Sequence, residues 1–345
     1  MLRRAFYAWE RNLAAATPDR VVRPFEWGLE WVPQNGCPPG ATPLERLEAY
    51  AAHALADSEA FYDAPRTTAC DFDAASGHLS FPSALDTGHA ENDTVHARFF
   101  PADPRSRWVK GRPRRAVLVL PHWNSPADGH VGLCRLFALF GLDALRLSLP
   151  YHDERMPPEL HRADYIVSSN LGRTLQVCRQ AVLDARRAVD WLEQRGYERI
   201  GIVGTSLGSC LSMLTAAHEP RIRAAALNHI SPYFADVVWE GLSTAHVRQG
   251  LDGHIDLERL RRVWMPISPQ AHLPRMRNTP TLLVYASYDL TFPVHLSKDL
   301  VRSWQNLGLP HEVAVLPCGH YSTGFTPWKW MDGFILTRFL VKTLG

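Results

Sequence analysis

The sequence predicts an α/β fold, in which a mostly parallel sheet is covered by helices on both faces. Two observations predict it. From about residue 94 onward, short apolar runs alternate with amphipathic helical segments. The run 116–120 is apolar at every position, which is typical of a strand buried on both faces of a sheet.

The elements of this region follow in a regular order. The apolar runs predict strands at 94–100, 116–120, 144–149, 199–203, 224–227, 281–286 and 312–316. Helical spacing predicts helices at 129–140, 173–194, 207–217, 294–306 and 328–340, and Gly196 closes the longest of them. Residues 231–277 interrupt the alternation with helical patterns at 234–249 and 257–264. They are too long for a simple connection, so we expect an insertion that acts as a lid over a pocket.

Residues 1–90 differ from the main domain, residues 91–345, and are expected to form an N-terminal extension packed on it. Helices are predicted at 2–15 and 43–61, the second with Thr42 as N-cap. An aromatic-rich stretch at 25–32 and a Pro/Gly-rich stretch at 36–40 lie between them. The extension has too few aliphatic residues for a core of its own.

Composition narrows the class of protein. The chain has 345 residues, 46% of them hydrophobic, so it can bury a large core. A net charge of +2 does not favour nucleic-acid binding, and the absence of a long apolar run excludes a spanning helix. The N-terminal apolar stretch is broken too early for a signal peptide, so we expect a cytoplasmic protein. Its six cysteines lack zinc-site spacing and are expected to be reduced, and the oligomeric state stays open.

A G-x-S-x-G motif stands where a predicted strand meets a predicted helix. The strand 199–203 runs into Gly204-Thr205-Ser206-Leu207-Gly208 and directly into the helix that follows. The flanking glycines leave room for neighbouring backbone in a sharp turn, which exposes the Ser206 hydroxyl at the carboxyl end of the sheet. There the Leu207 N–H faces a developing negative charge. The motif therefore predicts a nucleophilic serine.

A serine nucleophile needs a base, and the base needs an orienting acid. Asp289 follows the strand 281–286, and His320 follows the next strand. Because the carboxyl ends of parallel strands meet at one edge of a sheet, these side chains can converge on Ser206. We expect a Ser206-His320-Asp289 triad, with Asp236, after the preceding strand, as the alternative acid.

With these residues, the region 94–345 resembles the α/β-hydrolase superfamily. The resemblance rests on the Ser206 elbow, on Asp289 and His320, and on Pro121-His122-Trp123-Asn124 after an early strand. In that superfamily an early His-Gly segment shapes the oxyanion hole, and here Trp123 stands in place of the glycine. The resemblance implies that the N–H of Trp123 or of Asn124 joins that of Leu207, and that His122 braces the loop.

A weaker resemblance points to a little-characterised branch of the superfamily. Its members have a long N-terminal extension, a Pro-Tyr pair, here Pro150-Tyr151, and a helical insertion before the acid. Bacterial members carry generic or dienelactone-hydrolase-like labels, but dienelactone hydrolases proper use a cysteine where this chain has Ser206.

These residues and the resemblance together predict a serine hydrolase, foremost a carboxylic-ester hydrolase of small to medium acyl esters, working through an acyl-enzyme without a cofactor. The alternatives are thioester hydrolysis, acyl transfer, peptide cleavage, carbon–carbon bond hydrolysis or, from another class, a non-catalytic ligand-binding protein. The expected partner is a small-molecule ester or thioester. The residues expected to line its pocket are His122, Tyr151, Tyr233, Trp239 and Trp264.

Other chemistries lack their motifs. His152-Asp153-Glu154 and His161 have no metal-ligand spacing, so no metal is expected and their loop is interpreted as a pocket wall. The sequence has no P-loop and no dinucleotide fingerprint. A serine rather than an aspartate at the elbow argues against a haloalkane dehalogenase.

Overall fold

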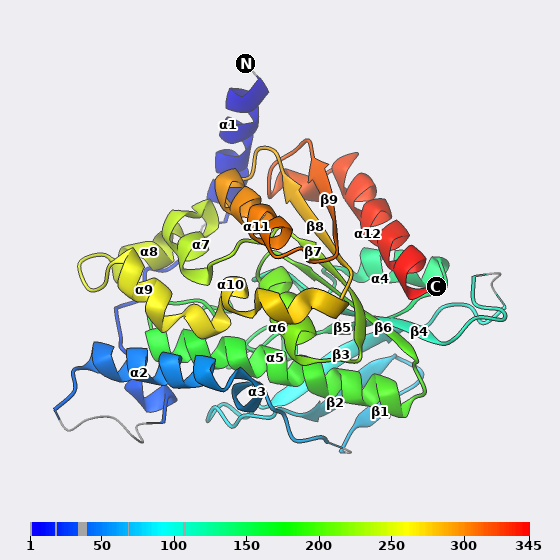
Figure 1. Ribbon diagram of the computed structural model, residues 1–345, viewed down its shortest axis with the longest axis horizontal. Helices are drawn as coiled ribbons and strands as arrows, with labels where there is room; N and C mark the ends of the chain where they lie inside the picture. Colours follow the sequence, from blue (N-terminus) through cyan, green and yellow to red (C-terminus); the bar gives the residue numbers. More distant parts are fainter. Residues whose placement is uncertain (1, 18, 34–39, 68, 106–107) are drawn as a thin grey trace.

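A twisted sheet of nine strands forms the centre of the molecule in the computed structural model, which describes residues 2–17, 19–33, 40–67, 69–105 and 108–345 (Figure 1). The strand order is β1-β2-β3-β5-β4-β6-β7-β8-β9. The strands from β5 to β9 pair in parallel, and β1, β2 and β3 are antiparallel to their neighbours. The strands are β1 Asp71–Asp73, β2 His78–Pro82, β3 Thr94–Phe100, β4 Arg115–Leu120, β5 Asp143–Leu147, β6 Arg199–Thr205, β7 Ile222–Asn228, β8 Thr281–Ala286 and β9 His311–Leu316.

Helices cover both faces of the sheet, as the alternation predicts. They are α1 Leu2–Ala15, α2 Pro43–Ala56, α3 Ser58–Phe61, α4 Val131–Leu139, α5 Leu171–Gln194, α6 Leu207–His218, α7 Phe234–Glu240, α8 Ala245–Leu251, α9 Leu257–Val263, α10 Pro269–His272, α11 Val294–Asn306 and α12 Trp328–Leu344. Helices α4 and α12 share one apolar core with the sheet, and α5, α6 and α11 share the other.

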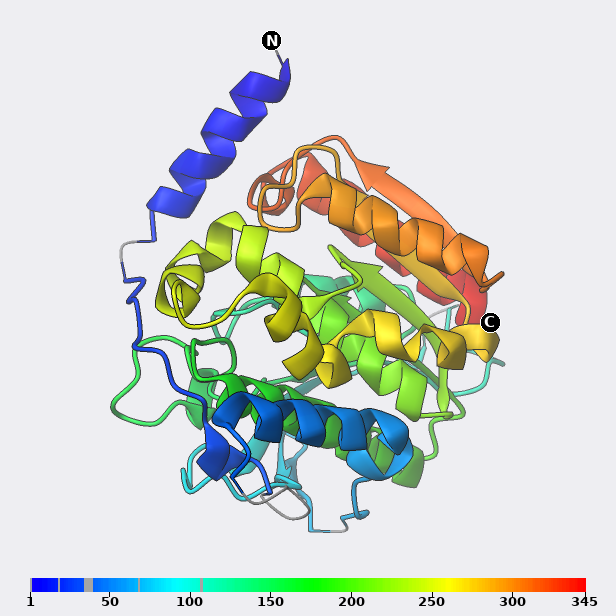
Figure 2. The same cartoon turned by 60° about the vertical axis from the view of Figure 1, so that its left-hand side comes forward.

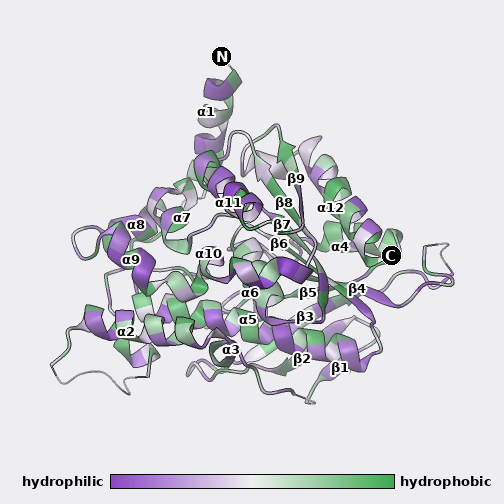
Figure 3. Cartoon of the chain, viewed as in Figure 1, coloured by the Kyte–Doolittle hydropathy of each residue, from purple (hydrophilic) through white to green (hydrophobic). Residues whose placement is uncertain are grey.

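The apolar run at 116–120 is explained by the burial of β4 on both faces of the sheet. Leu118 and Leu120 pack in the core with α5 and α6, and Val117 and Val119 pack in the core with α4. Successive side chains of a strand point to opposite faces, so a strand covered on both sides needs apolar residues throughout. Figure 3 shows this contrast between the apolar central strands and the more polar outer helices α9 and α11.

The sheet starts earlier in the chain than expected. Strands β1 and β2 lie within residues 1–90, where no strand was predicted, and β2 pairs with β3 over five residues. Only Leu79 and Phe81 of β2 are buried, because β1 and β2 form the edge of the sheet, and so short an alternation is a weak strand signal. Part of the extension is thus integral to the sheet. Most of the Pro/Gly-rich stretch at 36–40, with Cys37, lies outside the described residues.

The rest of the extension wraps around the domain. The capping box of Thr42 and Glu45 starts α2, but Asp57 caps a new turn, so the predicted helix 43–61 is two helices. Figure 2 shows α2 lying along α5, while α1 lies at the other end of the molecule with its N-terminal end directed outward. None of the helices that the structure describes has the length and apolar composition needed to cross a membrane.

The insertion is helical but more broken than expected. Instead of one helix over 234–249, α7 ends before Gly241 and α8 begins at Ala245. A Cβ at Gly241 would lie 2.4 Å from the Val237 carbonyl oxygen and 2.5 Å from that of Thr291, so the chain turns where only glycine fits.

Candidate active site

The G-x-S-x-G segment forms a strained turn between β6 and α6. Ser206 has φ 58° and ψ −120°, a conformation that non-glycine residues rarely adopt. A Cβ at Gly204 would lie 2.0 Å from the Gly208 carbonyl oxygen, and one at Gly208 would lie 2.2 Å from that of Leu120. The turn is therefore possible only with these two glycines, and it holds the Ser206 hydroxyl at the carboxyl end of the sheet.

The Asp289 carboxylate is buried and fully hydrogen bonded. Its Oδ1 accepts the N–H groups of Thr291 (2.8 Å) and Phe292 (2.7 Å), and its Oδ2 lies 3.0 Å from His320 Nδ1. Burial raises the pKa of Asp289, but His320 and a second histidine, His229, outweigh it and hold the pKa well below its ordinary value. An ionised Asp289 fixes the Nδ1–H tautomer of His320 and leaves Nε2 free to accept a proton.

The pKa of His320 is raised, whereas that of Asp289 is lowered. Burial lowers its pKa, but the Asp289 carboxylate and, with a smaller effect, Glu10 raise it above the ordinary value. Its ring stacks on Phe292, with the ring centres 5.5 Å apart and the planes at 6°. The imidazole is thus held by packing on one side and by a carboxylate at Nδ1.

Sequence reasoning missed His229, which also binds Asp289. It directly follows β7 with φ 58°, and its Nδ1 lies 2.8 Å from Asp289 Oδ2. Its Nε2 lies 3.4 Å from Thr323 Oγ1, so both ring nitrogens have partners. The signal that found Asp289 and His320, a polar residue just after a strand, was present at Asn228-His229 as well.

His229, Asp289 and His320 also form a group whose ligand atoms, within the described part of the chain, all lie within 4.8 Å of one another, a spacing that could hold a metal ion. Both imidazoles direct Nδ1 at the same carboxylate oxygen. An orienting acid requires one such contact, here with His320, and His229 adds a second to the same oxygen.

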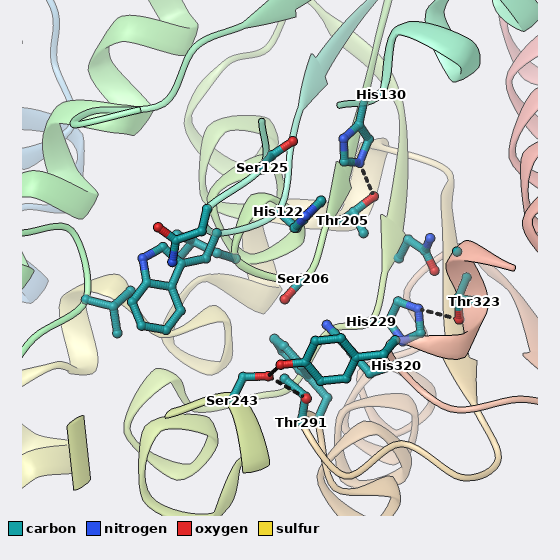
Figure 4. A pocket seen from close by; sticks show the side chains of 18 of the residues that line it. His122, Ser125, His130, Thr205, Ser206, His229, Ser243, Thr291, His320 and Thr323 are labelled. Atoms are coloured by element: carbon teal, nitrogen blue, oxygen red, sulfur yellow. Dashed lines mark hydrogen bonds between the residues drawn. The ribbon is translucent and has the colours of Figure 1, made fainter. Parts of the chain in front are cut away.

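Ser206 and His320 line one cavity of about 1000 Å³, and Figure 4 shows the Ser206 hydroxyl directed into it with His122 and His320 around it. Among the described residues, no hydrogen bond joins Ser206 to His320. In free enzymes this bond is often long and shortens only when substrate binds. A cavity of this size can enclose a ligand far larger than an acetyl group.

Trp123 and Asn124, the two candidates for a second oxyanion donor, differ in whether their N–H group already has an acceptor. The Asn124 N–H donates to His152 Nε2 at 2.9 Å, while His152 Nδ1 donates to the Pro150 carbonyl oxygen at 2.9 Å. Burial lowers the pKa of His152 to about 4, consistent with a neutral ring that accepts at Nε2. No acceptor is present among the described residues for the N–H groups of Trp123 and Leu207. The geometry favours Trp123 over Asn124.

The loop around these donors is held by the residues that looked metal-like in the sequence. His152 accepts from Asn124, and Asp153 pairs with Arg146 at 2.8 Å. Both line the cavity with His161, as expected of a pocket wall. His122 also lines the cavity. Burial and, with a smaller effect, the charge of His320 lower the pKa of His122 to about 4, so its imidazole is neutral.

Four of the aromatic side chains expected in the pocket do not line the cavity, and that expectation is corrected. Trp264 is fully buried against Phe234, Trp239 stacks under Arg248, Arg261 lies over Tyr233, and Tyr151 is hydrogen bonded to His89. Trp and Tyr rings are as well suited to packing in a core as to lining a pocket, and the sequence alone does not distinguish the two roles.

The insertion does reach the cavity, but through other residues: Phe234, Val237, Val238, Ser243, Thr244 and Pro269. The N-terminal extension contributes Thr17, Asp19 and Arg20. Asp236, the alternative acid, forms two hydrogen bonds to Arg261 at 2.6 and 3.0 Å and is absent from the cavity wall.

A buried carboxyl lies on the α12 side of the cavity. Asp332 Oδ2 accepts from Asn228 Nδ2 at 2.8 Å, whereas its Oδ1 has no partner among the described residues. Burial raises the pKa of Asp332 to about 6, although His229 and Asn228 lower it in part.

No protein-family model and no curated protein matches the sequence. Solved structures do match. The acylaminoacyl peptidase of Pyrococcus horikoshii is 14% identical with a TM-score of 0.59, over 81% of this chain and 42% of that one. The acetyl xylan esterase of Paenibacillus sp. R4 is 16% identical with a TM-score of 0.61, over 88% of this chain and 100% of that one.

Acetyl xylan esterase 1 of Thermoanaerobacterium sp. JW/SL YS485 is 15% identical with a TM-score of 0.59, over 92% and 97% of the two chains. This chain spans about two fifths of the acylaminoacyl peptidase chains it matches. At these identities the likeness concerns the fold, and it agrees with the strand order and with helices on both faces of the sheet. The chain has the α/β-hydrolase fold, as its sequence resemblance predicts.

Proposed function

We propose that the protein is a serine hydrolase that cleaves carboxylic esters of small to medium acyl groups through an acyl-enzyme. The observation that carries the proposal is that the strained Ser206 turn and His320 line one cavity, and that a buried, ionised Asp289 binds Nδ1 of His320. A chain holds a serine in this conformation at a cost in stability, and such strain is concentrated at functional sites.

The reaction follows from these positions. Ser206 Oγ attacks the ester carbonyl carbon while His320 Nε2 takes its proton, and the N–H groups of Leu207 and Trp123 bind the oxyanion. The carbon–oxygen bond to the alcohol then breaks, and His320 returns the proton to the leaving alcohol. Water attacks the acyl-enzyme, gives a proton to His320 and releases the acid, and that proton returns to Ser206.

The size and the walls of the cavity support an ester with an apolar acyl group. Val237, Val238 and Phe234 of the insertion line the same cavity as Ser206. The proposed reaction requires no cofactor. The acetyl xylan esterases among the structural neighbours act on acetyl esters by name, which agrees with this class.

The test is covalent labelling combined with a substrate panel. A fluorophosphonate should add once, on Ser206, and Ser206→Ala should abolish both the label and turnover of p-nitrophenyl esters. Ser243→Ala, which removes another hydroxyl of the same cavity, should keep the label. Matched thioesters and p-nitroanilides separate ester hydrolysis from the thioesterase and peptidase alternatives. Label or turnover that survives in Ser206→Ala would refute the assignment.

A further inference from the structure

Helix α1 of the extension touches both loops that carry the proposed acid and base. Phe6 stacks on Tyr288, the residue before Asp289, with ring centres 4.4 Å apart and planes at 7°. One helical turn later, Glu10 reaches the residues that follow His320. Figures 1 and 2 show the C-terminal end of α1 on the side of the molecule where α7 lies.

Glu10 binds the base loop through the main chain. Its carboxylate is fully buried, with Oε2 accepting the Tyr321 N–H at 2.8 Å and Oε1 the Ser322 N–H at 2.9 Å. The contact is close, because a Cβ at Gly319 would lie 2.3 Å from Glu10 Cδ. Glu10 thus holds the residues on both sides of His320.

The energetics of this carboxylate are unusual for a packing residue. In the described part of the chain, Glu10 forms no ion pair with an arginine or lysine. Burying a carboxylate is costly, and here two charge-assisted N–H bonds offset that cost. An apolar side chain would anchor the helix as well, so the position of the charge beside His320 requires a reason.

We propose that Glu10 is a positioning residue for the catalytic base: it fixes the loop that carries His320 and favours the charged imidazolium that forms during turnover. The inference rests on the proposed function, since it requires His320 to act as the base. It also gives the N-terminal extension a part in catalysis, to which Arg20 adds a hydrogen bond to the Tyr321 hydroxyl at 2.8 Å.

Several ionisable groups face His320. Asp289 binds Nδ1, His229 lies with its ring centre 4.6 Å away, Tyr321 lies edge-on at 5.9 Å, and His122 interacts with it across the cavity. Two carboxylates, Asp289 and Glu10, raise the pKa of His320. Removing the charge of Glu10 should therefore make His320 less basic and lower the pH at which activity rises.

The experiment compares Glu10→Gln with Glu10→Asp, using p-nitrophenyl acetate from pH 5 to 9. Glutamine keeps the size but loses the charge and one acceptor, and aspartate keeps the charge but is one methylene too short to reach both amides. Both variants should lose kcat by about tenfold or more with KM nearly unchanged, because the base is displaced. In Glu10→Gln, the midpoint of the pH profile should also fall.

Glu91→Gln makes the same chemical change at an exposed position and should match the wild type. Wild-type kcat in either folded Glu10 variant, or an unchanged pH midpoint in folded Glu10→Gln, would overturn the inference. If Glu10→Gln does not fold, kcat of Glu10→Asp decides. A wild-type protein without label or turnover would instead refute the proposed function. The two failures are therefore distinguishable.

Discussion

The substitution Asp289→Asn tests the proposed triad most directly. In the structure, Asp289 Oδ1 accepts two main-chain N–H groups and Oδ2 faces the Nδ1 atoms of His229 and His320. The main-chain donors will orient the new amide so that its oxygen replaces Oδ1. The NH₂ group then points at His320 and forces Nδ1 to act as an acceptor. The imidazole proton therefore moves to Nε2, and a protonated Nε2 cannot accept the proton of Ser206.

Loss of the correct tautomer in a Ser-His-Asp triad lowers kcat about 10⁴-fold, which corresponds to about 5.5 kcal/mol at about 1.36 kcal/mol per tenfold. The assay is kcat for p-nitrophenyl acetate at pH 8, with thermal unfolding to establish that the variant is folded. Asp236→Asn is the matched control, because that carboxylate pairs with Arg261 and should change kcat less than about threefold. A folded Asp289→Asn variant that keeps kcat within tenfold of the wild type would refute the reasoning.

Two further predictions concern stability and the pocket. The pKa of Asp332 is raised from its ordinary value of 3.8 to about 6, so its ionisation opposes folding; this cost is absent well below pH 4 and complete above pH 6. Asp332→Asn should therefore gain about 1 kcal/mol more over the wild type at pH 8 than at pH 5 in urea unfolding, and an equal gain at both values would contradict it. Trp264→Ala should lower the free energy of unfolding by about 3–5 kcal/mol and leave the order of preferred substrates unchanged. Val237→Phe should instead lower kcat/KM for longer acyl esters relative to acetate esters. The reverse pattern would show that the cavity is assigned to the wrong residues.

The sequence alone predicted the strands from β3 to β9 and the helices between them outside the insertion, because the central parallel strands are buried on both faces and are mostly apolar. It also predicted that Ser206, Asp289 and His320 lie at one edge of the sheet, since residues that follow parallel strands gather there. The turn at Ser206 needed only local information, because the two glycines and the strand–helix junction define it.

Tertiary structure decided the contacts between segments far apart in the chain. Glu10 looks like any acid of an amphipathic helix, and only the folded chain brings it to Tyr321 and Ser322, more than 300 residues away. Trp264 and Val237 likewise differ in role only by the direction in which each side chain points. Local periodicity predicts burial but not which residue packs against which, so the residues that line the cavity and the contact of Glu10 with the loop after His320 depend on long-range packing.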